Sequence, residues 1–303
     1  MSFKPVRLLG YAMVLASAVC FASYGVWARL IGADFGIFFQ GWVRSAIILA
    51  VLFPIALLTK SLKPIKKEDR TWFAVTVLFA VFTQVPIYYA YNHLALGTAN
   101  LIFYSVFLIT SYIVGAVWMG EKLGVVKLIS LVLALTGLSV TFGLSLKVFS
   151  LTALALAAFS GIASGGEIST SKKSSQYSSI QITVYIWFFT VLTHLPLSLL
   201  NGEKQIVPAL NSEWFAMLAY AATGLVGFWL VIEGFKHIDA SIGGLIGLSE
   251  IVFSICFGVI LFGDGFGVST IIGAILILSA AMLPDIWALA FRQRLPKLPV
   301  INL

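Results

Sequence analysis

The chain has 303 residues, of which 60% are hydrophobic and only 10% are charged, and its mean hydropathy is +1.03. A soluble domain carries roughly 25% charged residues, so this composition excludes a soluble globular fold and indicates an integral membrane protein. The net charge of +7 is distributed over the ends of apolar runs, which argues against a nucleic-acid partner. Because about 20 apolar residues span a bilayer, the chain has room for about ten spanning helices and no large soluble domain.

Ten apolar runs predict ten transmembrane helices joined by short connections. The predicted ranges are Leu8 to Leu30, Phe35 to Leu58, Trp72 to Asn92, Thr98 to Met119, Val125 to Ser145, Leu151 to Ser171, Ile180 to Leu200, Trp214 to Lys236, Ile242 to Phe262 and Val268 to Leu289. The first run is longer than the apolar segment of a cleavable signal peptide, so we expect it to remain in the mature chain. Consecutive helices are expected to lie antiparallel because their connections are short.

The basic residues predict the orientation of the chain in the membrane. Most of the 19 Lys and Arg residues fall at span ends on one side, whereas the other side holds Arg29, Lys147 and Lys204 and Arg44 lies within a span. By the positive-inside rule, both termini of this multi-pass protein are expected to be cytoplasmic, in the cell's inner membrane.

Short motifs recur about 140 residues apart, which predicts an internal repeat. The pairs are Trp-Phe-Ala at 72–74 and 214–216, Gln40 and Gln181, and Gly120-Glu121 and Gly263-Asp264. The predicted units are residues 1–147 and 148–303, each with five helices. Since five is odd, the second unit must enter the membrane in the opposite sense. Such inverted repeats place a substrate site near the bilayer midplane and permit alternating access.

The ninth span is punctuated by glycines, carries Ser-Glu-Ile at 249–251 and ends in Phe-Gly-Asp, while its counterpart in the first half ends in Gly-Glu-Lys. In this order, and in both halves, these motifs resemble the EamA-type carriers of the drug/metabolite transporter superfamily over essentially the whole chain. The resemblance implies ten helices in a five-plus-five inverted arrangement and transport of small metabolites such as amino acids, amines or nucleotide-like compounds. In the family a proline commonly follows the central glutamate. Here Ile251 follows Glu250, so we expect the ninth helix to lack the usual kink, and Asp264 replaces the usual terminal glutamate.

Glu250 shares one helical face with Gly243, Gly247 and Ser254. An ionised group at this depth costs at least about 2.5 kcal/mol on insertion scales, so this face is expected to contact protein or water. Two interpretations stay open. Glu250 is either a carboxylate that couples transport to protons or binds a cation, or a structural glutamate that holds helices together by hydrogen bonds.

Arg44 is the one basic residue predicted to lie within a span. A guanidinium group binds a carboxylate through two parallel hydrogen bonds, so Arg44 is a candidate clamp for a carboxylate substrate. Alternatively, it forms a structural pair, for which Glu250 is the candidate partner.

The other candidate substrate-binding residues are aromatic or polar side chains on the first, third, fourth, sixth and eighth spans: Tyr24, Trp27, Gln84, Tyr88, Tyr104, Glu167, Trp229 and Glu233. Tyrosines in mid-membrane need hydrogen-bond partners, which suggests a wall of protein or a cavity. Trp229 and Glu233, one turn apart, would suit an ammonium group. The alternative for Glu233 is a pair with nearby Lys236, and for Glu167 it is solvation at the membrane interface.

These observations predict a secondary transporter of a small polar metabolite, such as an amino acid or amine, that works by alternating access and is not an enzyme. Its expected partners are the substrate, membrane lipids and, as candidates for coupling, protons. No nucleotide-binding loop of the GxxxxGK[ST] type is present, and no cofactor or metal site is expected. The alternatives are a channel or lipid scramblase, and least favoured, a membrane-embedded lipid-modifying enzyme, for which the three histidines are too scattered.

Overall fold

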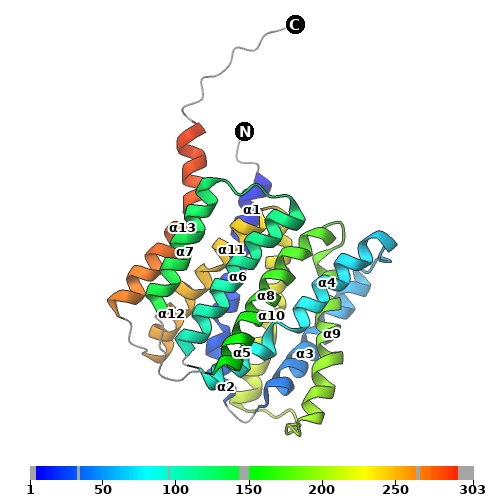
Figure 1. The fold of residues 1–303 in the computed structure, drawn as a ribbon. Coiled ribbons are helices and arrows are strands. Elements are labelled where there is room, and N and C mark those ends of the chain that lie inside the picture. The colour runs from blue at the N-terminus through cyan, green and yellow to red at the C-terminus, as the bar shows by residue number, and fades with distance from the viewer. Residues whose placement is uncertain (1–4, 33–34, 95, 143–149, 264–266, 293–303) are drawn as a thin grey trace.

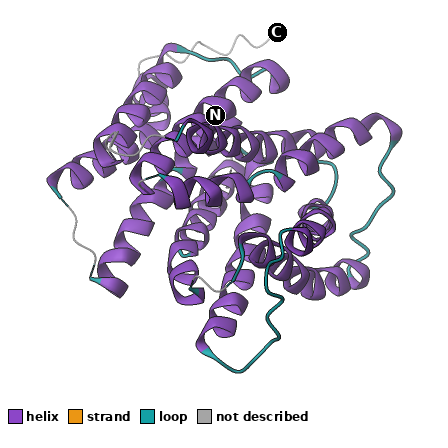
Figure 2. Cartoon of the chain, turned by 60° about the horizontal axis from the view of Figure 1, so that its bottom comes forward, coloured by secondary structure: helices purple, strands orange, loops and turns teal. Residues whose placement is uncertain are grey.

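A computed structural model describes residues 5–32, 35–94, 96–142, 150–263 and 267–292. Over these residues the chain forms helices and no strand, as predicted (Figure 2). The helices are α1 (Pro5–Ala22), α2 (Tyr24–Ile31), α3 (Ile37–Leu58), α4 (Arg70–Val81), α5 (Gln84–His93), α6 (Leu96–Met119), α7 (Val125–Phe142), α8 (Leu151–Ser171), α9 (Ser179–Leu200), α10 (Ser212–Phe235), α11 (Ala240–Gly247), α12 (Ser249–Phe262) and α13 (Val268–Arg292). The predicted boundary between the two halves, at residues 147 and 148, lies outside the described residues, as does Asp264.

Nine helical stretches within the described residues are long and apolar enough to cross a membrane. They correspond to the first nine predicted spans and confirm an integral membrane protein. The tenth predicted span lies on α13, whose apolar part, Val268–Pro284, is shorter than the other nine. A count of ten therefore stays a prediction.

Three of the predicted spans are each divided into two helices. The first is interrupted at Ser23, the third at Phe82 and Thr83, and the ninth at Leu248. The ninth span is divided at Leu248 without a proline, and the expectation that this helix lacks the usual kink stays a prediction. The Leu248 amide donates to the carbonyls of both Gly244 (3.3 Å) and Leu245 (3.2 Å), so the helix tightens into a turn within its glycine-rich segment.

The packing of the helices repeats when the two halves are exchanged (Figure 1). Helix α6 packs against α8. The counterparts of α6 in the second half, α11 and α12, pack against α1, which is the counterpart of α8. Helix α1 packs against α10, and α8 packs against α4 and α5. Helices α3 and α9 pack against each other, as do α7 and α13. This is the pattern expected of an internal repeat with two-fold pseudosymmetry.

The connections show that α3 and its predicted counterpart α9 run in opposite directions. Glu203, in the connection after α9, accepts hydrogen bonds from the backbone N–H groups of Phe38 (3.1 Å) and Phe39 (2.6 Å) at the start of α3. At the opposite end of the bundle, Gln181 at the start of α9 donates to the carbonyl of Lys63 (2.6 Å), in the connection after α3, and accepts from its N–H (3.2 Å). Each of these two helices is therefore held at its N-terminus by the connection that follows the other.

Candidate functional site

A cavity of about 880 Å³ lies between the two halves and is lined by residues from both of them. Its volume falls within the roughly 300–1,000 Å³ that is usual for small-molecule sites. All three helix breaks border it, through Tyr24 at the first, Thr83 and Gln84 at the second, and Gly247 and Glu250 at the third. Discontinuous helices at a repeat interface are a common way to build a transporter site, because they turn polar side chains and backbone groups toward the substrate.

The cavity extends to one end of the bundle. Gly32, Phe35, Gly36 and Ile37, which connect α2 to α3, are part of its lining. This connection lies at the end of the bundle opposite to the start of α1 and the end of α13 (Figure 1). The cavity thus extends to the end of the bundle that the basic residues predict to face away from the cytoplasm.

The other end of the bundle is held together by Glu121, whose side chain is only 5% exposed. Glu121 follows α6 in the first half, and its carboxylate accepts hydrogen bonds from the start of α11 in the second half. The donors are the N–H groups of Ala240 (2.5 Å) and Ser241 (3.3 Å) and the Ser241 hydroxyl (2.8 Å). An anion at a helix N-terminus is favourable because the helix dipole and the free N–H groups both point toward it.

Two lysines complete this cluster. Lys127 Nζ lies 3.5 Å from Glu121 Oε2 and 2.9 Å from Asp239 Oδ2, and Lys172 Nζ lies 3.3 Å from Glu121 Oε1. Lys172 also donates to the carbonyl of Ile238 (2.7 Å). We call Glu121, Lys127, Lys172, Asp239 and Ser241 the closing cluster. It joins the two halves at the end of the bundle opposite to the connection between α2 and α3.

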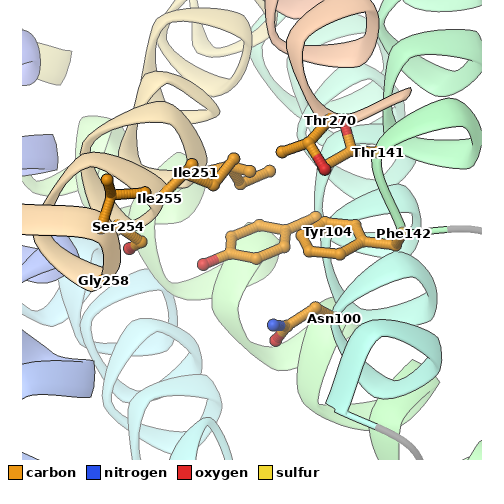
Figure 3. Close-up of a pocket in the computed structure, with 10 residues that line it drawn as sticks. Asn100, Tyr104, Thr141, Phe142, Ile251, Ser254, Ile255, Gly258 and Thr270 are labelled. Atoms are coloured by element: carbon orange, nitrogen blue, oxygen red, sulfur yellow. The ribbon is translucent and has the colours of Figure 1, made fainter. Parts of the chain in front are cut away.

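Glu250 lines the cavity from the first turn of α12. Its Oε1 accepts a hydrogen bond from the hydroxyl of Tyr104 on α6 (3.0 Å), and Figure 3 shows this hydroxyl pointing toward α12. A side pocket of about 300 Å³ shares Asn100, Tyr104, Ser254 and Gly258 with the cavity. Tyr104 therefore lies where the two spaces meet and holds the carboxylate there.

Glu167 lines the cavity from α8 and is 2% exposed. Its Oε2 accepts a hydrogen bond from the Thr83 hydroxyl (2.8 Å), whereas Oε1 has no hydrogen-bond partner among the described residues. Two glycines on the same helix let α8 approach α6 closely: a Cβ at Gly161 or Gly165 would lie 2.6 Å from a backbone oxygen of α6. The small residues of this span therefore bring helices together and do not form a solvated interface around Glu167.

Arg44 is fully buried on α3, and it does not line the cavity. Its guanidinium group donates to Gln84 Oε1 and lies over the rings of Tyr220 (4.3 Å), Trp187 (5.1 Å) and Tyr24 (5.3 Å). The predicted ion pair between Arg44 and Glu250 does not form. The guanidinium group of Arg44 is surrounded by Gln84 and the three rings, whereas the carboxylate of Glu250 accepts a hydrogen bond from Tyr104 on α6. The carboxylate whose field reaches Arg44 is Glu167.

The structure brings five of the predicted site residues to the cavity: Tyr24, Gln84, Tyr104, Glu167 and Glu250. Trp27 is not one of the described lining residues. Its ring N–H donates to the Ser23 hydroxyl (3.0 Å), and its side chain packs against the hydrophobic cluster that includes Ile31 and Trp214. The side chain of Tyr88 lies outside the described residues.

Trp229 and Glu233 do not line the cavity either. Trp229 is 38% exposed on the outside of α10, since one residue of helix rotates its side chain away from the lining residue Phe228. Glu233 accepts from the Ser179 hydroxyl and pairs with Lys236 (2.9 Å) and His237 (3.6 Å). Glu233 therefore forms the ion pair with Lys236 that was the alternative expected from the sequence.

Two further residues of the cavity, Tyr220 and Thr83, were not predicted from the sequence. Tyr220 lines the cavity, packs edge-on against Tyr24 with ring centroids 4.6 Å apart, and contacts Arg44. It lies in mid-span, where a tyrosine needs a polar partner, and that signal could have favoured it over Trp229. Thr83 had no such signal, because its role depends on a helix break.

The chain is similar to several known proteins. The pseudopaline exporter CntI of Pseudomonas aeruginosa is 25% identical over 200 residues, which cover 65% of this chain and 69% of that protein. An uncharacterized transporter of Haemophilus influenzae is 35% identical over 96 residues, 31% of this chain and 53% of that protein. A solved crystal structure superposes with a TM-score of 0.77 at 18% identity, over 96% of this chain and 99% of that one, and shows the fold alone.

The family comparison covers most of the chain. A model described as the EamA-like transporter family matches residues 8–143 and again residues 151–283. These two matches follow one another along the chain, in agreement with the internal repeat seen in the packing of the helices. The chain belongs to the EamA-like transporter family.

Proposed function

We propose that this protein is a secondary transporter that moves a small polar metabolite, an amino acid, amine or related compound, across the cytoplasmic membrane by alternating access. The observation that carries the proposal is a cavity between inverted halves that reaches one end of the bundle, while the closing cluster joins the halves at the other end. Rocking of one half against the other would exchange which end is joined.

Alternating access requires contacts at the closed end that can be broken and remade. The closing cluster meets this requirement, because it consists of ion pairs and hydrogen bonds rather than interlocked apolar side chains. With both termini in the cytoplasm, the state described here would have its substrate site open away from the cytoplasm. The relative named as a pseudopaline exporter supports a small-molecule substrate and outward movement.

Counterflow in liposomes tests the proposal. A carrier loaded with unlabelled substrate should take up labelled substrate transiently above equilibrium, with a saturable rate. A channel or lipid scramblase, the main alternative, would give flux that neither saturates nor shows counterflow. If no member of an amino-acid, amine and nucleotide panel moves under a substrate or proton gradient, the proposal is wrong.

Glu250 is the proposed proton-coupling residue. It lies in the cavity with one oxygen held by Tyr104, where binding of a substrate and binding of a proton would compete. The net flux that remains in the Glu250→Gln variant should lose its pH dependence, because an amide takes up no proton in this pH range. If that pH dependence is unchanged, Glu250 has a structural role only.

A further inference from the structure

The charged side chains that the structure describes in the lining of the cavity are both acidic. Among the described residues that line it, the only charged side chains are Glu167 and Glu250, and none is Lys, Arg or His. The nearest buried cation, Arg44, is occupied by Gln84 and three aromatic rings and is not part of the lining. A substrate carboxylate would therefore meet two like charges and no basic side chain of the described lining.

Both glutamates have the capacity to bind an ammonium group. Glu167 Oε2 accepts from Thr83, and its Oε1, in a residue only 2% exposed, has no hydrogen-bond partner among the described residues. Glu250 Oε1 accepts from Tyr104. An ionised carboxylate accepts about four hydrogen bonds and donates none, so a ligand that approaches either group must bring donors.

The lining of the cavity also suits a cation. Its aromatic residues come from both halves and include Phe21, Tyr24, Phe103, Phe107, Tyr220 and Phe228. Their rings pack edge-on in the pairs Phe21–Phe228 and Tyr24–Tyr220, which fixes their faces in place. Ring faces attract cations, and their apolar surface accommodates an aliphatic chain.

We propose that the substrate is an aliphatic diamine, with one terminal ammonium group bound by Glu167 and Thr83 and the other by Glu250 and Tyr104. This inference rests on the proposed function and deepens it, because it selects dications over the zwitterions that a transporter of amino acids would bind. Glu167 lies on α8 and Glu250 on α12, so the length of the carbon chain becomes a specificity determinant.

The unaltered protein provides the first test, by thermal stabilisation with compounds of matched length. The panel is a length series of α,ω-diamines, the corresponding monoamines, and ω-amino acids in which one ammonium is replaced by a carboxylate. A diamine of one preferred length should stabilise most, the monoamine less, and the ω-amino acid least. If the ω-amino acid stabilises as well as the diamine, the inference is overturned.

Variants assign the two ends. Glu167→Gln and Glu250→Gln should each weaken binding of the preferred diamine by about tenfold to a hundredfold, the usual effect of losing a hydrogen bond to a charged group. Monoamine binding should fall in only one of them. Glu233→Gln is the matched control, because this carboxylate pairs with Lys236 outside the cavity, and it should leave diamine binding unchanged. Equal diamine binding in all three variants would contradict the inference.

The same compounds separate this inference from the proposed function. Counterflow of amino acids without any response to diamines would overturn the diamine site and leave the transporter intact. Binding of diamines without flux would support the site and contradict transport. If either glutamine variant fails to fold, the length series on the unaltered protein still decides the matter.

Discussion

Glu121→Gln should release the start of α11 without unfolding the protein. The substitution keeps the shape of the side chain, and its amide oxygen can still accept from the Ala240 N–H group. It removes the charge that faces Lys127 at 3.5 Å and Lys172 at 3.3 Å. Both lysines keep other partners, Asp239 and the carbonyl of Ile238 respectively, so neither cation is left alone.

The magnitude follows from the contacts that are lost. A hydrogen bond to a charged group contributes about 1.5–3 kcal/mol, and removal of one partner from a buried ion pair costs about 3–5 kcal/mol. Because Gln retains part of the hydrogen bonding and the lysines retain partners, we expect the lower range, about 1.5–3 kcal/mol. If this cost applies only to the closed end, local opening there becomes about 10 to 150 times more frequent.

Amide hydrogen exchange of a peptide that contains Ala240 and Ser241 measures this opening directly, since both N–H groups donate to Glu121. Exchange at the start of α11 should accelerate in Glu121→Gln, whereas exchange at the start of α3, which Glu203 holds at the opposite end, should not. Glu233→Gln, which breaks an ion pair at the same end outside the cluster, is the control. Unchanged exchange in a folded Glu121→Gln protein would refute the role given to the closing cluster.

Three further substitutions test packing and the cavity. Gly165→Ala should lower the free energy of unfolding by about 1–3 kcal/mol, because the added Cβ would lie 2.6 Å from the Phe107 carbonyl oxygen. The control is Gly25→Ala, whose Cβ would meet nothing within 4 Å and which should leave thermal unfolding unchanged. Equal effects of the two substitutions would contradict this packing. Tyr104→Phe removes the donor to Glu250 and should weaken ligand stabilisation about tenfold or more, and unaltered ligand stabilisation would count against the site. Arg44→Lys should destabilise the protein, because a compact ammonium group cannot contact Gln84 and three aromatic rings together. The order of ligand preference should not change, since Arg44 does not line the cavity. A changed order would place Arg44 in the binding site.

The spans and the repeat could be predicted from the sequence because both depend on local composition. In the hydrocarbon core every backbone polar group needs a hydrogen-bond partner within the protein, so a long apolar run is expected to form a spanning helix. The duplicated motifs then indicate which helices are counterparts. The resulting expectation of an internal repeat agrees with the exchange of packing partners between the halves and with the doubled family match.

The helix breaks could not be predicted, because the same residue has opposite outcomes in different places. Pro86 cannot donate a hydrogen bond to the carbonyl of Phe82, and the third span breaks there. Pro54 and Pro196 leave the same kind of gap, yet α3 and α9 continue through them. The ninth span breaks at Leu248 with no proline at all. Whether a helix tolerates a missing hydrogen bond depends on its neighbours, and these are not visible in the local sequence.

The carboxylates illustrate the same limit at the level of the site. Glu167 and Glu233 both lie near the end of an apolar span and close to lysine, so hydropathy treats them alike. In the structure the two carboxylates point to different surroundings. Glu233 has Lys236 three residues away in sequence and pairs with it, whereas Glu167 accepts from Thr83 at the break in the third span and pairs with no lysine among the described residues. Only the packing of α8 against the broken third span gives Glu167 its position in the cavity.

The two halves contribute unequal chemistry from equivalent places. Phe107 occupies the position in α6 that the repeat assigns to Glu250 in the second half, and both side chains line the cavity. Similarly, the first span presents Tyr24 to the cavity, while its counterpart α8 presents Glu167. The inverted repeat thus explains why these positions face one space, but not why two carry a charge. A scaffold that served packing alone would not require a carboxylate at either position, because an ionised group buried at this depth is costly. The proposed diamine would account for this asymmetry, because its two ammonium groups would neutralise the two carboxylates.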